Sequence, residues 1–135
     1  MKFTVYGKPQ AKQRPRVTRR GYALTPKETV YYENLVKSEY VRQCGEMLEG
    51  AIKADIKAYF EVPKSTSKKK RAQMLSGEIL RTQKPDCDNL AKSILDALNG
   101  IAYHDDSQVV ELHVSKGYAE QPRIECELDV LQSPE

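Results

Sequence analysis

Cysteine, long apolar runs and, near the N-terminus, acidic side chains are scarce in this sequence. The three cysteines, Cys44, Cys87 and Cys126, are widely spaced and odd in number, and they form no Cys-x-x-Cys pair. This spacing argues against a structural zinc site and favours a reduced, intracellular compartment. The first residues are too polar for a signal peptide, and no apolar run is long enough to span a membrane. We therefore expect a soluble, cytoplasmic protein with no membrane partner.

The scarcity of acids is sharpest over residues 1–27, which hold no aspartate or glutamate although the formal net charge of the whole chain is only +3. Such an asymmetry predicts a partner with regularly spaced negative charge. Residues 8–27 also combine three prolines and one glycine with arginines, whose paired donors match phosphate oxygens. We expect this segment to be a basic loop on a nucleic-acid backbone. The candidate DNA-binding side chains in it are Lys8, Lys12, Arg14, Arg16, Arg19 and Arg20.

A second basic run, Lys68–Arg71, follows a stretch of serine and threonine. Two interpretations of this run remain open. In one, Lys69 and Arg71 bind phosphates of the same nucleic acid. In the other, the run is only the solvated start of a helix, which is the more usual role of a charged run.

The hydrophobic pattern predicts four strands in a chain whose length of 135 residues suits one domain. Polar and apolar side chains alternate over residues 2–6 and, more strictly, over residues 52–60, which predicts strands with one buried face. Residues 108–116 and 123–131 are predicted to be two further strands. The connection between these last two is short enough for an antiparallel hairpin.

Helices are predicted between the strands. Thr25 is placed to cap a helix that runs to about Cys44, and a short helix begins in the second basic run and ends near Leu75. Apolar residues at i, i+4, i+7 and i+8 predict another helix over residues 89–99, with Gly100 as the residue after its end. The residues expected to define the faces of the first helix are Val30 or Tyr31, Leu35 and Val41 or Arg42.

The order of these elements predicts an α+β fold, in which a single mixed β-sheet carries helices on one face. Residues 78–84 are either a short strand or a mobile loop. We find no internal repeat and no composition change that would divide the chain.

Aspartates gather at both ends of the last predicted helix. Asp86 and Asp88 precede it, Lys92 lies four residues beyond Asp88, and the pair Asp105–Asp106 follows it. On an extended chain residues two apart point the same way, so we expect both Asp86 and Asp88 to face one cation. Mg²⁺ is typically held by one or two carboxylates plus substrate phosphates, and a lysine stabilises charge that develops on phosphate. The combination predicts a site that cleaves phosphodiester bonds.

Each of these side chains also has an ordinary structural explanation. Asp88 is placed to cap the helix, where aspartate is favoured. Lys92 is spaced for a weak surface ion pair with Asp96, and Asp105–Asp106 is an ordinary acidic turn before a strand. The occurrence of acids at both ends of one short helix favours the functional interpretation.

The same residues resemble a known family. Residues 86–92, 95–98 and 105–109 are similar to the D-x-D-N-x-x-K…D-A-L…D-D-x-Q-V core of RusA-type Holliday junction resolvases. Residues 7–16 and the Thr-Pro pair at 25–26 resemble the branch of that family common in Gram-positive bacteria and their prophages. The resemblance covers most of the chain, and only residues 45–80 match loosely.

The resemblance implies one RusA-like domain over residues 1–135, with its catalytic motif at residues 84–109. It implies a homodimeric endonuclease that depends on Mg²⁺, with Mn²⁺ able to substitute, and cuts four-way DNA junctions symmetrically. A two-fold dimer would suit a two-fold junction. By motif position, the catalytic residues would be Asp86, Asp88, Lys92 and Asp106, the three acids among them would bind the metal, and Asp105 and Asn89 would support them.

Three alternatives compete with this interpretation. A restriction-type nuclease would share the Pro85-Asp86 pair, but no (Asp/Glu)-x-Lys follows Asp86 anywhere in the chain. The chain could instead be a less selective nuclease of branched or duplex DNA, or a nucleic-acid-binding protein without activity. A module that only binds has no need to hold acids near phosphates, which counts against the last alternative.

Overall fold

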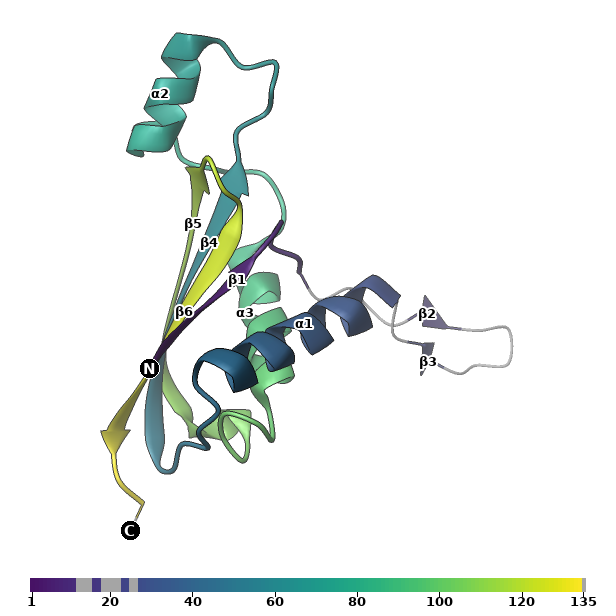
Figure 1. Ribbon diagram of the computed structural model, residues 1–135, viewed down its shortest axis with the longest axis vertical. Coiled ribbons are helices and arrows are strands. Elements are labelled where there is room, and N and C mark those ends of the chain that lie inside the picture. Colours follow the sequence, from purple (N-terminus) through teal and green to yellow (C-terminus); the bar gives the residue numbers. More distant parts are fainter. Residues whose placement is uncertain (12–15, 18–22, 25–26, 135) are drawn as a thin grey trace.

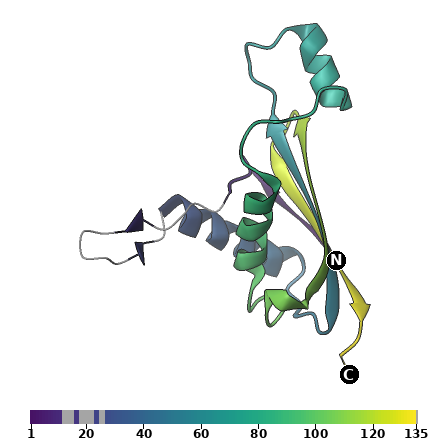
Figure 2. The same ribbon diagram turned by 180° about the vertical axis from the view of Figure 1, so that it is seen from behind.

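The computed structural model describes residues 1–11, 16–17, 23–24 and 27–134, and of residues 16–17 and 23–24 it describes the backbone alone. A four-stranded sheet in the order β1-β6-β4-β5 carries two helices on one face, in the predicted α+β architecture (Figures 1 and 2). The elements are β1 (Lys2–Tyr6), β2 (Arg16–Val17), β3 (Ala23–Leu24), α1 (Lys27–Gln43), β4 (Ala51–Glu61), α2 (Lys68–Ser76), α3 (Cys87–Leu98), the 3₁₀ turn η1 (Asp106–Gln108), β5 (Val109–Ala119) and β6 (Arg123–Gln132).

The central strand β4 confirms the period of two that its sequence predicts. Its inward residues, from Ile52 to Phe60, are all buried, and its outward residues are exposed or half-buried. On one side β4 pairs antiparallel with β6, which in turn pairs antiparallel with β1. On the other side β4 pairs parallel with β5, so the sheet is mixed.

The predicted hairpin between β5 and β6 is wrong, because the two strands lie on opposite sides of β4. Their connection is short, but the step from Ala119 to Arg123 can span about 13 Å when extended. Strands separated by one intervening strand lie about 9.6 Å apart, so this link reaches across the end of β4. β6 lies between β1 and β4, and its buried residues Ile124, Cys126 and Leu128 extend the buried row of β4.

The helices α1 and α3 cover one face of the sheet (Figure 1). The buried residues of α1 are Thr29, Tyr32, Val36 and Tyr40. This corrects the predicted faces of α1, because Val30, Tyr31 and Val41 are exposed and only Leu35 packs partly against the core. Two tyrosines on the inward side bury more surface than the valines on the outward side, so the aliphatic residues of this helix did not reveal its packed face.

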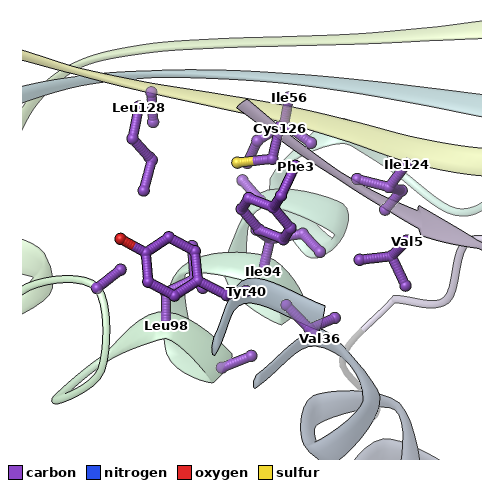
Figure 3. Packing of buried hydrophobic residues seen from close by; sticks show 14 of the residues in the cluster. Phe3, Val5, Val36, Tyr40, Ile56, Ile94, Leu98, Ile124, Cys126 and Leu128 are labelled. Atoms are coloured by element: carbon purple, nitrogen blue, oxygen red, sulfur yellow. The ribbon is translucent and has the colours of Figure 1, made fainter. Parts of the chain in front are cut away.

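The core lies between the two helices and the sheet (Figure 3). In it the rings of Phe3 and Tyr40 meet edge to face, with centroids 5.3 Å apart. The predicted apolar stripe of α3 is confirmed, since Leu90, Ile94 and Leu98 are fully buried.

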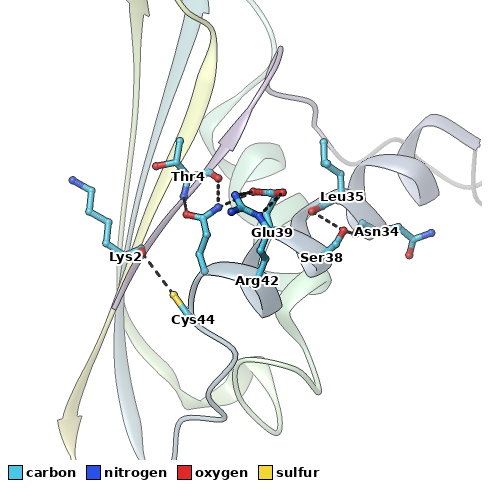
Figure 4. Close-up of polar contacts among 9 residues, drawn as sticks. Lys2, Thr4, Asn34, Leu35, Ser38, Glu39, Arg42 and Cys44 are labelled. Atoms are coloured by element: carbon cyan, nitrogen blue, oxygen red, sulfur yellow. Dashed lines mark hydrogen bonds and ion pairs between the residues drawn. The ribbon is translucent and has the colours of Figure 1, made fainter.

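At the outer edge of β1, the backbone of Thr4 forms two hydrogen bonds (Figure 4), and their partner is Gln43 at the end of α1. Its side-chain amide accepts a hydrogen bond from the backbone N–H of Thr4 at 2.9 Å and donates one to the Thr4 carbonyl at 2.7 Å. An edge strand offers such groups to other chains unless they are covered. The end of α1 therefore closes this side of the sheet.

The remaining elements extend beyond the sheet. α2 projects from the end of the sheet at which β4 finishes (Figure 1), and Met74 is its buried residue. Residues 78–84 form no strand and link α2 to α3. The basic segment predicted as a loop contains one short pairing, β2 with β3, whereas the predicted cap Thr25 lies outside the described residues. Among the described residues, no helix combines the length and apolarity needed to cross a membrane.

Candidate active site

The two aspartates that precede the last predicted helix lie at the N-terminus of α3. Asp86 is the N-cap residue, with extended backbone (φ −74°, ψ 153°), but its carboxylate makes no capping hydrogen bond. Asp88 lies in the first turn of the helix. The prediction that Asp88 caps the helix, or lies on extended chain beside Asp86, is therefore wrong, because the helix begins at Cys87.

Both carboxylates are exposed, and neither has a hydrogen bond or ion pair with a described residue. The free N–H groups of a helix N-terminus stabilise nearby negative charge. The arrangement therefore leaves the side chains of Asp86 and Asp88 available to an external cation.

A lysine that the sequence did not single out fixes the chain just before this helix. The Lys116 ammonium on β5 donates hydrogen bonds to the carbonyls of Gln83 at 2.9 Å and Pro85 at 3.1 Å. The peptide bond before Pro85 is cis. On the other side of Asp86, the thiol of Cys87 lies 3.9 Å from the Val114 carbonyl of β5. The start of α3 is thus tied to β5 on both sides of Asp86.

Lys92 lies one helical turn beyond Asp88 and is exposed. The surface ion pair predicted for it with Asp96 does not form, because no described residue pairs with Lys92. Asn89, the predicted supporting residue, is half-buried and lines a groove next to Asp86. Lys92 and Asn89 therefore lie on the same helix as the two acids, with the Lys92 amine free to reach a ligand.

The acidic pair that follows α3 has two separate environments. Asp105 caps η1. The hydroxyl of Ser107, and to a smaller extent its backbone N–H, hold the pKa of the Asp105 carboxyl below its usual value. In the same capping box, the Gln108 side chain accepts hydrogen bonds from the backbone N–H groups of His104 and Asp105 and donates to the Gly50 carbonyl. Asp106 is exposed, and no described residue pairs with its carboxylate. The carboxylate of Asp105 therefore stabilises the turn on which Asp106 is exposed.

The structure does not bring Asp106 together with Asp86 and Asp88. The acids flank α3, which at about 1.5 Å per residue separates its two ends by about 18 Å. β5 gives the same result: the turn η1, which holds Asp106, leads directly into Val109, whereas Lys116 holds the residue before Asp86, and Val109 and Lys116 are about 23 Å apart along β5. Accordingly, no three Asp, Glu, His or Cys side chains cluster as a metal site within the described part of this single chain.

A groove of about 460 Å³ adjoins the N-terminus of α3. The segment after β1 forms one wall, and residues 81–86 form the other. Its lining residues are Lys8, Pro9, Gln10, Ala11, Arg81, Lys84, Pro85, Asp86 and Asn89. Three of them are basic and one is acidic, so the groove favours an anionic ligand.

The predicted DNA-binding residues are only partly within the described chain. Lys8 is exposed and lines the groove. Lys69 is exposed on α2, where Arg71 is half-buried, and both lie at the start of a helix capped by Ser67. The positions outside the described residues are Lys12, Arg14, Arg19 and Arg20, and for Arg16 the backbone alone is described.

Sequence reasoning missed Arg81, Lys84 and Lys116. Arg81 and Lys84 stand alone in a segment of undecided structure, and Lys116 lies in a strand, so no charge run marked any of them.

Comparison with known proteins identifies the class to which this fold and site belong. A model of a nuclease family, described as endodeoxyribonuclease RusA, matches residues 6–129. The chain is thus an endodeoxyribonuclease, and the predicted enzyme class is confirmed. It belongs to the RusA family, and that membership implies an endonuclease that resolves Holliday junctions.

One similar protein is YqaN of Bacillus subtilis (strain 168), which is described as uncharacterized. The two chains are 42% identical over 133 residues, which is 93% of this chain and 92% of that protein. The description names no prophage, so the predicted branch within the family stays a prediction.

Proposed function

We propose that the chain is a Mg²⁺-dependent, structure-selective DNA endonuclease that resolves Holliday junctions by paired, symmetric hydrolysis of phosphodiester bonds. The observation that carries the proposal is the pair of exposed carboxylates of Asp86 and Asp88, which have no partner among the described residues and lie beside a basic groove. A surface that only bound nucleic acid would be weakened by these two charges, because they repel phosphates. A surface that holds a cation against phosphates needs them.

Asp86 and Asp88 fit a magnesium ion. Two carboxylates at one helix N-terminus repel each other unless a cation neutralises them, and Mg²⁺ typically takes one or two carboxylates plus phosphate oxygens and waters. Mn²⁺ prefers the same oxygen ligands, which supports its substitution. When bound, the ion supplies neutralisation of the phosphate charge and activation of water.

The residues around the two acids have separate roles in this proposal. Lys92, one turn along α3, contacts the scissile phosphate and stabilises the charge that develops on it. Asn89 offers amide donors and an acceptor on the groove side. Asp105 holds the turn that presents Asp106.

The separation of Asp106 from Asp86 supports a site shared between two protomers. The outer edge of β5 pairs with no strand in the described chain, and Val110 and Leu112 at its start are 61% and 48% exposed. An antiparallel pairing of two β5 edges about an axis at Leu112 would place these apolar side chains in the interface. It would also place Asp106 opposite the residue two positions beyond Lys116 of the partner subunit, near that subunit's α3 N-terminus.

Cleavage of a synthetic four-way junction tests the function. The protein is incubated with the junction and with linear duplex of the same sequences, with and without Mg²⁺. We expect paired nicks in the junction alone, and only with the ion. Binding without Mg²⁺-dependent nicking would contradict the proposal, whereas equal cutting of duplex would leave a nuclease and remove the selectivity for junctions.

Asp88→Asn tests the metal ligand. We expect the variant to lose at least about 100-fold in cleavage rate, because the neutral amide is a poorer cation ligand. Its affinity for the junction in EDTA should be retained. Asp96→Asn makes the same change on the same helix and serves as the matched control, with near-normal cleavage expected. Turnover retained by Asp88→Asn would remove Asp88 from the site.

A further inference from the structure

Arg81 is held in a defined orientation at the edge of the groove. Its guanidinium carbon lies 4.0 Å from the ring centroid of Phe60 and 6.0 Å from that of Tyr118. One terminal nitrogen donates a hydrogen bond of 2.7 Å to the Lys84 carbonyl. Stacking on a ring restricts the guanidinium plane without using its N–H donors. The donors of Arg81 are thus oriented before any ligand arrives.

Most of these donors have no acceptor in the described chain. A guanidinium carries five N–H donors, of which the Lys84 carbonyl takes one. The Nε atom is buried and has no hydrogen-bond partner. Burial of such a donor without an acceptor is costly. A ligand that offers paired oxygens would satisfy donors of Arg81 in the geometry that guanidinium prefers.

The position of Arg81 indicates where such a ligand would lie. Arg81 and Lys8 line both the groove next to Asp86 and a second cavity of about 240 Å³, which also includes Phe60 and Glu61. The two cations therefore stand where the two cavities adjoin. A chain of regularly spaced anions that runs along the groove from Asp86 would pass both of them.

The charges of the groove favour an anionic ligand, such as a phosphate, in this position. Lys8, Arg81 and Lys84 contribute three positive charges against the one negative charge of Asp86, and the N-terminus of the twelve-residue helix α3 adds backbone N–H donors. Lys84 is exposed, so its ammonium can follow the ligand.

We propose that Arg81, assisted by Lys8 and Lys84, binds a backbone phosphate of the DNA strand next to the phosphate that is cleaved. The proposal rests on the proposed function in one respect, since it takes the cleaved bond to lie at Asp86 and Asp88. In this role Arg81 holds the DNA strand in register. It is a phosphate-binding residue outside the predicted metal site.

Binding to four-way junctions in EDTA tests this role without cleavage. We expect Arg81→Gln to weaken binding about tenfold and to lower the slope of log affinity against log salt by about one, because one phosphate contact is lost. Arg81→Lys should keep the slope but not the full affinity, since an ammonium cannot donate in pairs. Arg123→Gln is the matched control: Arg123 stacks on Tyr59 on the opposite face of the sheet, and Glu125 pairs with it at 2.8 Å.

A chemical change in the DNA locates the contact. Junctions are prepared with one neutral methylphosphonate linkage at each position in turn around the cleaved bond. At one linkage next to the cleaved bond, the substitution should weaken binding of the wild type about tenfold. It should not weaken binding of Arg81→Gln further, because that variant already lacks the contact. Equal losses for both proteins at every linkage, with an unchanged salt slope, would overturn the proposal.

Two further outcomes keep the result interpretable. If circular dichroism finds Arg81→Gln unfolded, Lys84→Gln carries the same test, because its exposed side chain supports no packing. If one methylphosphonate linkage weakens binding by the wild type but not by Arg81→Gln, and the wild type never cleaves with Mg²⁺, a phosphate contact of Arg81 stands, whereas its place beside a cleaved bond and the proposed nuclease mechanism fall. If the wild type cleaves junctions and neither variant changes binding, the mechanism stands and the phosphate site falls.

Discussion

At the scale of single residues, four aspartates with the same side chain are given different tasks by the backbone around them. Asp86 and Asp88 lie at a helix N-terminus, and their carboxylates have no partner within the described chain. Asp105 uses its carboxylate to cap η1, which leaves Asp106 exposed on the turn. A carboxylate that accepts hydrogen bonds is stabilised in its charged form. The proposed supporting aspartate therefore differs from the proposed metal ligands in its hydrogen bonding.

The pH response of Asp105 follows from its cap. Its folded-state pKa is depressed, so the stability that the cap contributes is present above the unfolded-state pKa and is lost as the pH falls through the folded-state pKa. Ser107→Ala removes the hydroxyl, which is the larger cause, and should raise the pKa toward its usual value. Carboxyl carbon shifts followed by NMR during an acid titration measure this. An identical midpoint in the variant would show that the hydroxyl does not hold the carboxylate.

At the scale of elements, the strands and helices with a regular apolar period were predictable. Alternation in β4 and the stripe of Leu90, Ile94 and Leu98 each depend on residues close in sequence. The order of strands was not predictable in this way, because β5 and β6 compete for the same edge and their three-residue link permits either a hairpin or a crossing. The packed face of α1 was missed because Tyr32, Val36 and Tyr40 are buried, whereas Val30 and Val41 are exposed.

The same limit applies to the candidate site. Its acids were recognised from local spacing, but their arrangement depends on contacts between distant segments. Lys116 holds Gln83 and Pro85 across more than thirty residues of sequence, and no pattern near either end marks that contact. The length of α3 was predictable, yet its consequence, that Asp106 lies far from Asp86, required the direction of α3 against β5.

Lys116→Met tests how β5 positions the start of α3. The change leaves two backbone carbonyls without their donor, so we expect a loss of about 1 kcal/mol in the free energy of unfolding, measured in urea. Because the residue before Asp86 is released, the Mg²⁺ concentration for half-maximal cleavage should rise several-fold. Lys116→Arg keeps N–H donors at this position and should retain part of the stability and part of the Mg²⁺ affinity. Lys53→Met, an exposed lysine on β4, is the control; an effect as large there would make the role of Lys116 non-specific.

At the scale of the whole molecule, one protomer holds the parts of the predicted metal site at two ends of one helix. Within a single chain, Asp86 precedes α3 and Asp106 follows it, and the two ends of this helix are about 18 Å apart. A two-fold axis through the free edge of β5 would bring opposite ends of two protomers together, and would do so twice. Two equivalent sites suit the paired cuts proposed for a junction. The proposed dimer would thus complete the proposed site.

Mixing of inactive variants tests whether each site takes residues from both protomers. Asp88→Asn and Asp106→Asn homodimers should each be inactive. If Asp106 completes the site of the partner subunit, a mixed dimer has one site with both changes and one intact site. An equal mixture after subunit exchange should then recover about a quarter of the wild-type sites, since half of the dimers are mixed. These dimers should nick one strand instead of cutting two.

A mixture of Asp86→Asn with Asp88→Asn is the control. Both positions lie at the α3 N-terminus of their own protomer, so each site of a mixed dimer still contains one of the two changes and should stay inactive. Mass spectrometry shows whether mixed dimers have formed. If they have and the first mixture recovers no activity at any ratio, or if only the control recovers activity, then Asp106 either belongs to the site of its own chain or is not part of the site.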